Sequence, residues 1–91
     1  MTYPRDLALQ AIQTAFAPFA CGAGWTIFGD AIQFRVVTQD GEPILAGHTL
    51  EERVWSDREV LDDTIYWLRE AVRQHTGQEL LPWRSPDPPE D

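Results

Sequence analysis

The chain has 91 residues, 43% of them hydrophobic, and its 15 acidic and 7 basic side chains give a formal net charge of -8. This length and composition are typical of one small globular domain, because so short a chain cannot form two separate cores. No apolar run approaches the roughly 20 residues of a membrane-spanning helix. We also see no secretory signal, and the single cysteine, Cys21, cannot form an internal disulfide, so we expect a cytoplasmic protein.

The kind of charge also bears on origin and partners. All 7 basic residues are arginine, and the chain lacks lysine and asparagine, both of which have A-rich codons. We therefore expect a GC-rich, bacterial source. A negative surface repels phosphate backbones, so the sequence predicts no nucleic-acid partner, and it predicts no membrane partner either.

The first predicted element is a helix from about Pro4 to Ala17. Proline suits a first helical turn, and Pro18 ends the helix. One apolar stripe at helical spacing predicts its buried face: Ala8, Leu9, Ala11, Ile12, Ala15 and Phe16. The small residues 20–24 are expected to form a flexible connector.

Two turn signals then predict a three-stranded antiparallel sheet. A two-residue turn at Gly29-Asp30 places Trp25 opposite Phe34, and a turn at Asp40-Gly41 places Val36 opposite Leu45 and Gly47 opposite Phe34. The face that this register directs to the core contains Trp25, Ile27, Ile32, Phe34, Val36 and Leu45. The residues that it directs to the outer face include Phe28, Val37 and Ile44.

The last predicted element is a helix from about Asp57 to Thr76. Ser56 and Glu59 have the spacing of a capping box, and Gly77 suits a left-handed helix stop. Its buried stripe is expected to contain Leu61, Ile65, Leu68 and Val72.

These elements predict an α+β two-layer sandwich of α-β-β-β-α order, with two helices on one face of the sheet. We expect a single globular domain over residues 1–84, followed by a disordered, acidic, proline-rich tail over residues 85–91. Double-stranded RNA-binding domains share this element order. However, Ser56-Asp57-Arg58-Glu59 stands where that family has phosphate-binding lysines, so the likeness in topology does not predict RNA binding.

Candidate catalytic groups are few. Cys21 with His48 or His75 has no local motif of a nucleophile site, and two histidines make a poor set of metal ligands. The carboxylate pairs Asp62-Asp63 and Glu51-Glu52 are typical of solvated helix faces. We therefore expect no catalytic residues, no cofactor and no metal, and hence no enzyme, although distant residues could still form a small enzyme's pocket.

An interaction surface is the leading functional prediction. Phe28, Val37 and Ile44 come from three neighbouring strands and would form one apolar patch, and Trp67 lies beside the buried stripe of the last helix. We assign these four residues to an interface. The sequence thus predicts a non-enzymatic interaction or accessory protein that forms a homodimer through the outer sheet face.

An alternative is that the acidic surface imitates nucleic-acid phosphates and occupies a basic protein partner, as some phage-encoded or mobile-element inhibitors do. The residues assigned to this surface are Glu51, Glu52, Asp57, Glu59, Asp62 and Asp63. Arginines such as Arg53 and Arg58 lie among them, which is typical of an ordinary salt-bridged helix.

Overall fold

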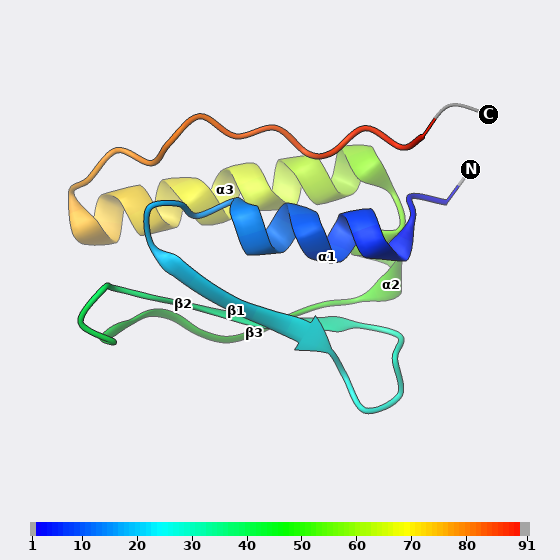
Figure 1. Ribbon diagram of the computed structural model, residues 1–91, viewed down its shortest axis with the longest axis horizontal. Helices are drawn as coiled ribbons and strands as arrows, with labels where there is room; N and C mark the ends of the chain where they lie inside the picture. Colours follow the sequence, from blue (N-terminus) through cyan, green and yellow to red (C-terminus); the bar gives the residue numbers. More distant parts are fainter. Residues whose placement is uncertain (1, 90–91) are drawn as a thin grey trace.

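A computed structural model describes residues 2–89. The elements in chain order are α1 (Arg5–Thr14), β1 (Ala20–Trp25), β2 (Ile32–Val37), β3 (Pro43–Leu50), α2 (Glu52–Trp55) and α3 (Arg58–Thr76). The strands form one antiparallel sheet in the order β1-β2-β3, and α1 and α3 cover one of its faces (Figure 1). The predicted α-β-β-β-α sandwich is confirmed, with the short helix α2 in addition. Among the described residues, no helix has the length and apolar character required to cross a bilayer.

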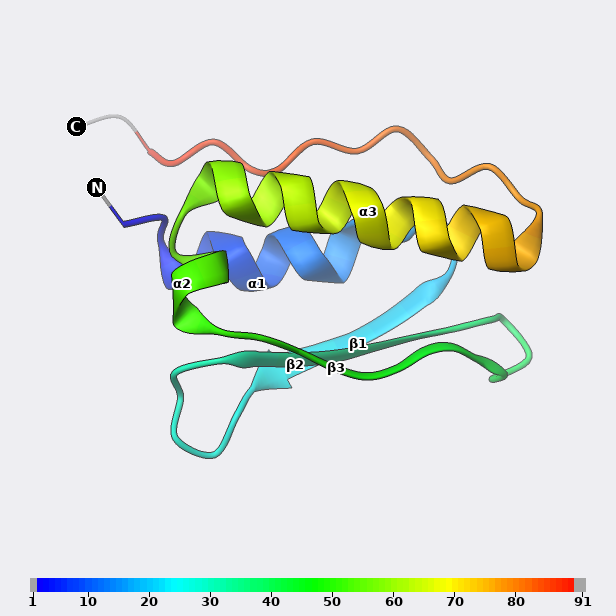
Figure 2. The ribbon, with the colours of Figure 1, turned by 180° about the vertical axis from the view of Figure 1, so that it is seen from behind.

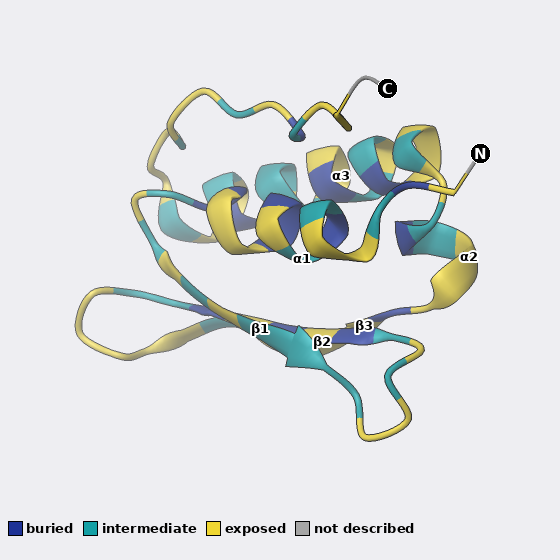
Figure 3. Cartoon of the chain, turned by 45° about the vertical axis from the view of Figure 1, so that its right-hand side comes forward, coloured by how far each residue is buried: buried dark blue, intermediate teal, exposed yellow. Residues whose placement is uncertain are grey.

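The core lies between the helix layer and the sheet, where buried residues line the facing sides of both (Figure 3). Phe16 lies just after α1, and its ring stacks on the ring of Phe34 in β2, with the ring centroids 5.9 Å apart. The largest fully buried side chains are those of Ile12, Phe16, Ile32, Val36, Leu61, Ile65 and Val72. All of them belong to the apolar stripes and the sheet face that the sequence predicts to be buried.

The first hairpin differs from the prediction in its loop and register. The predicted connector 20–24 is strand β1, and Trp25 pairs with Ile32 instead of Phe34. The Thr26 N–H donates to Ala31 O, so Ile27–Asp30 form a longer loop in place of the two-residue turn. A shift of two residues keeps Trp25 on the core face, since side chains alternate with period two. However, it leaves Ile27 outside the sheet, so the core assignment of Ile27 is wrong.

The second hairpin contains irregularities that the prediction lacked. Val36 pairs with Leu45 as predicted, but Phe34 pairs with His48 and Val37 with Pro43. The register shifts between these pairs. Gly47 adopts φ +65°, a backbone conformation that residues other than glycine rarely adopt. The residues paired on the outer face include Gly22, Gly24, Gln33, Arg35 and Thr49, which are small or polar, and Val37, which is apolar.

The start of α3 is capped by a different residue from the predicted one. The Asp57 carboxylate accepts a hydrogen bond from the Glu59 N–H at 3.1 Å, whereas Ser56 ends α2. The predicted Ser56–Glu59 capping box is therefore wrong, because the extra turn α2 shifts the cap by one residue. Gly77 ends α3 with φ +72°, as predicted.

Residues 78–89, called the C-terminal segment below, run back along the helix layer on the side away from the sheet (Figure 2). Ser85 is only 4% exposed and accepts a hydrogen bond from Arg58. The expectation of a disordered tail beginning at Ser85 is wrong for residues 85–87, because side chains from distant elements hold them. Residues 90–91 of the predicted tail lie outside the described residues.

Candidate functional sites

The four residues assigned to the interface do not form one patch. Phe28 lies in the loop before β2, and Val37 lies at the opposite end of that strand. Val37 and Ile44 are half-buried, and Ile44 packs against the core. Trp67 is exposed, but it lies on α3 in the helix layer. The four residues therefore do not form the predicted apolar patch on the outer sheet face, and a homodimer through that face stays a prediction.

The most exposed large apolar side chains lie in the loop over residues 26–31, called the 26–31 loop below. Ile27 is 94% exposed and Phe28 is 88% exposed, which are the highest values among the exposed large hydrophobic residues. In all three ribbon views the loop projects from the sheet on the side away from the helices (Figures 1, 2 and 3). Two neighbouring apolar side chains thus stand at a protruding tip.

Hydrogen bonds hold the backbone of the 26–31 loop in place. Within the loop, the Gly29 N–H donates to Thr26 O at 2.8 Å, and the Thr26 hydroxyl donates to the Asp30 carboxylate at 3.1 Å. Gly29 has φ +71°, which permits the turn. From outside the loop, the Trp55 indole N–H donates to Asp30 O at 2.9 Å.

An aromatic and cationic cluster supports the base of the loop. The Trp25 and Trp55 rings meet edge to face with centroids 5.1 Å apart, and Trp55 is buried. The Arg5 guanidinium lies 4.0 Å from the centroid of the Trp25 ring. Packing of this kind adds to hydrogen bonding and holds the loop base against α1 and α2.

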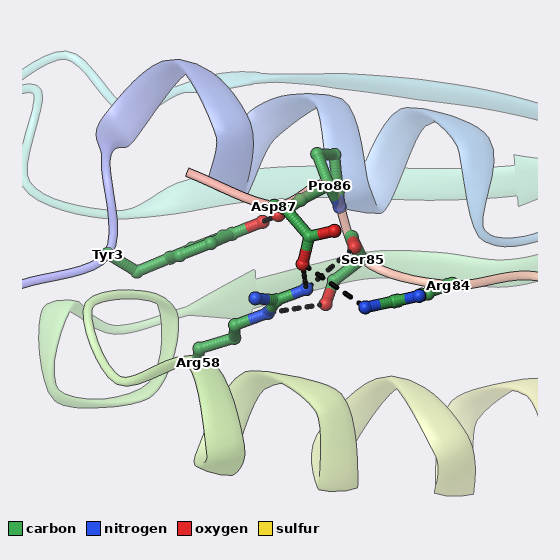
Figure 4. A network of polar contacts seen from close by, with 6 residues as sticks. All are labelled: Tyr3, Arg58, Arg84, Ser85, Pro86 and Asp87. Carbon is green, nitrogen blue, oxygen red and sulfur yellow. Dashed lines mark hydrogen bonds and ion pairs between the residues drawn. The ribbon is translucent and has the colours of Figure 1, made fainter. Parts of the chain in front are cut away.

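A second polar cluster binds the far end of the C-terminal segment to the body (Figure 4). Arg58 at the start of α3 donates through Nε to the Ser85 hydroxyl, and through Nη2 to Ser85 O and to the Asp87 carboxylate, all at 2.8–2.9 Å. The Tyr3 hydroxyl donates to Pro86 O. Because Arg58 donates to the carboxylate of Asp87, the pKa of Asp87 is lowered and that of Arg58 is raised.

The near end of the same segment is held by Arg69 on α3. Its guanidinium donates to Ala15 O and, at 2.8 Å, to Leu81 O, and burial lowers the pKa of Arg69. The Leu81 N–H donates to Ala17 O, and the Trp83 indole N–H donates to the Thr14 hydroxyl. The segment therefore spans both α1 and α3.

Space remains beside the segment. A groove of about 430 Å³ lies between α3 and residues 83–85, with Asp62, Tyr66 and Arg69 among its lining residues. A second hollow of about 280 Å³ lies between Tyr3, Arg58 and Pro88-Pro89. Asp62 Oδ1 is buried and has no hydrogen-bond partner within residues 2–89, which is uncommon for a buried carboxylate oxygen.

The structure places the candidate catalytic groups Cys21, His48 and His75 on three different elements. Cys21 is half-buried on β1, and burial raises the pKa of its thiol to about 11. His48 is exposed on β3, where its ring stacks on Phe34, and His75 is exposed near the end of α3. Within residues 2–89, no three histidine, cysteine or carboxylate side chains lie close enough to hold a metal ion.

The six acidic residues of the alternative surface have mixed surroundings. Glu51 pairs with Arg53 at 2.8 Å, Asp57 caps α3, and Asp62 is half-buried. Glu52, Glu59 and Asp63 are exposed. Five of the six side chains are therefore exposed, although Glu51 and Asp57 each have a partner within the fold.

The sequence did not predict the 26–31 loop, because Ile27 and Phe28 were interpreted as strand residues. It also missed Arg58 and Arg69 as anchors of the C-terminal segment, and no local pattern distinguishes these arginines from solvated ones. In comparisons with known proteins, no protein-family model matched the chain, and no curated protein and no solved structure was found to be similar.

Proposed function

We propose that this chain is a small bacterial, cytoplasmic interaction protein without enzymatic activity, and that it docks onto another protein through the 26–31 loop. One observation carries the proposal: Ile27 and Phe28 are 94% and 88% exposed at the tip of a loop whose backbone is held by hydrogen bonds. An exposed apolar tip is suited to binding because its side chains gain free energy when a partner buries them.

The free energy expected from burying Ile27 and Phe28 favours a binding role for these side chains. Fully burying a side chain such as Ile or Phe contributes about 1.5–3 kcal/mol. A loop that is already ordered loses little further conformational freedom on binding, so more of this free energy appears as affinity. Ile27 and Phe28 would therefore act as the hot spot of a small interface.

The shape and charge of the chain define the partner. A protruding tip requires a concave apolar pocket, and a net charge of -8 favours basic residues around that pocket. The same charge disfavours insertion of the tip into a bilayer with anionic headgroups. We therefore assign the tip to a protein partner.

The absence of catalysis is part of the proposal, and the state of the thiol supports it. A raised pKa keeps the Cys21 thiol protonated at neutral pH, and the thiolate is the nucleophilic form. His48 stacks on Phe34 with ring centroids 5.7 Å apart and serves as a packing group there.

Affinity capture from the native host tests the proposal with three baits. The baits are the wild type, Phe28→Asp, and Thr49→Asp as a control with the same charge change on the exposed outer sheet face. We expect a protein that the wild type and Thr49→Asp retain and Phe28→Asp loses. A set of bound proteins that is the same for all three baits would overturn the proposal.

A further inference from the structure

The C-terminal segment and the groove beneath it have the form of a peptide and its binding site. Residues 78–89 contain no helix or strand and include four prolines, Pro82, Pro86, Pro88 and Pro89. They extend in the direction opposite to α3, across the side of the helix layer away from the sheet (Figures 1 and 2). Proline-rich segments of this kind favour extended conformations and are common ligands of aromatic-lined grooves.

Three side chains of the body donate hydrogen bonds to main-chain oxygens of this segment. Leu81 O accepts from Arg69, Ser85 O accepts from Arg58, and Pro86 O accepts from the Tyr3 hydroxyl. Contacts to carbonyl oxygens do not depend on the side chain of the bound residue, so another extended peptide could make them equally well. Selectivity would come from the side chains that the body also contacts: the Ser85 hydroxyl and the Asp87 carboxylate, which accept from Arg58, and the Trp83 indole, which donates to Thr14.

The segment also fits its groove incompletely. Hollows of about 430 and 280 Å³ flank it, and Asp62, on α3 one turn after Arg58, keeps a buried carboxylate oxygen without a partner within the described residues. Asp62 is among the residues that line the larger hollow, so the resident segment leaves this acceptor unused. Gly77, with φ +72°, separates the segment from α3 and lies where it would pivot.

We infer that the surface of the helix layer that residues 78–89 cover, together with the two hollows that flank them, is a docking site for an extended, proline-containing peptide of a partner protein, and that residues 78–89 occupy it until such a peptide displaces them. This site is separate from the 26–31 loop. The peptide carries a hydroxyl or carboxylate near a proline, as Ser85-Pro86-Asp87 does, since these groups match the guanidinium of Arg58.

Competition between the tethered segment and a free peptide tests the inference. The probe is a fluorescently labelled synthetic peptide of residues 78–89, titrated with the full-length chain and followed by anisotropy. The wild type should bind it weakly, since a short tether gives the resident segment an effective concentration on the order of millimolar. The double variant Ser85→Ala, Asp87→Ala weakens only the resident segment and should bind the probe at least about 10-fold more tightly, in line with that competition.

Two controls separate a binding groove from a merely structural contact. Adding Arg58→Gln to the double variant should abolish the gain, and a probe with Ala in place of Ser85 and Asp87 should bind the double variant more weakly than the native probe. The second control keeps the test decisive if the triple variant does not fold. Phe28→Asp should leave probe binding unchanged, which distinguishes this site from the loop. Equal binding of the probe by the wild type and the double variant, or of the two probes by the double variant, would overturn the inference.

Discussion

Trp55 connects the 26–31 loop to the body through two different contacts. Its indole N–H donates to Asp30 O, and its ring meets Trp25 edge to face. Trp55 is 3% exposed, whereas Asp30 is exposed, so the hydrogen bond is partly buried. A single buried residue therefore determines how firmly the base of the loop is held.

We predict that Trp55→Phe lowers the free energy of unfolding by about 1–3 kcal/mol, because it removes this hydrogen bond and leaves a void. The amides of Thr26 and Gly29, which donate within the hairpin, should exchange with solvent faster. Urea unfolding and hydrogen exchange measure both effects. The matched control is Trp83→Phe, which removes an exposed indole contact to Thr14 and should leave those amides unchanged. Unaltered exchange in Trp55→Phe would contradict the bracing role.

Cys21 allows a prediction of pH dependence. Burial raises the pKa of its thiol from 9.0 to about 11, so at pH 8 the thiolate fraction should be roughly 100-fold lower in the folded chain than in the unfolded one. Because the folded pKa is the higher one, the associated stability is present below pH 9 and is lost as the pH rises toward 11. Iodoacetamide labelling with and without urea checks this, and equal rates in the two states would contradict it.

Among the elements, the helices follow local patterns and the first hairpin does not. Apolar stripes and Gly77 locate α1 and α3 to within a few residues. By contrast, β1 contains Ala20-Cys21-Gly22-Ala23-Gly24, small residues that rarely favour a strand, and it forms because β2 provides a pairing edge. The turn dipeptide Gly29-Asp30 lies within a longer loop, and this displaced the predicted register by two residues.

The C-terminal segment also depends on contacts with distant residues that a local sequence pattern does not reveal. Its composition is typical of a disordered tail, yet Arg58, Arg69 and Tyr3 hold it from positions far away in the chain. Single-sequence reasoning sees the prolines but not the groove that receives them. For the same reason the candidate sites were predicted less well than the fold.

In the C-terminal segment, Arg58→Gln should lower the free energy of unfolding by about 1–2 kcal/mol, because it removes charge-assisted hydrogen bonds to the buried Ser85 and to Asp87. It should also increase the backbone motion of Ser85 and Asp87, whose amides NMR relaxation can follow. Arg53→Gln is the matched control: the Arg53–Glu51 pair is exposed, so its loss should change stability by no more than about 0.5 kcal/mol. Equal effects of the two substitutions would show that the C-terminal segment is not held by Arg58.

For the whole molecule, charge and shape together oppose self-association. Apart from Val37 and Pro43, the paired residues of the outer sheet face are small or polar, and each copy has a net charge of -8. Two loop tips that met would bury far less than the roughly 800 Å² per partner of a stable interface. We therefore predict a monomer in sedimentation velocity experiments at micromolar concentrations. A dimer that persists in Phe28→Asp would restore the sheet face as an interface.

The central claim is that Phe28 anchors a protein partner. The most direct test is to measure, by calorimetry at fixed salt, the dissociation constants of the complexes that the captured partner forms with the wild type and with Phe28→Ala. A hot-spot residue contributes about 2 kcal/mol or more, so the substitution should weaken binding by about 30-fold. Thr49→Ala, on the outer sheet face, should leave the constant unchanged. A dissociation constant that Phe28→Ala changes no more than Thr49→Ala does would contradict the account.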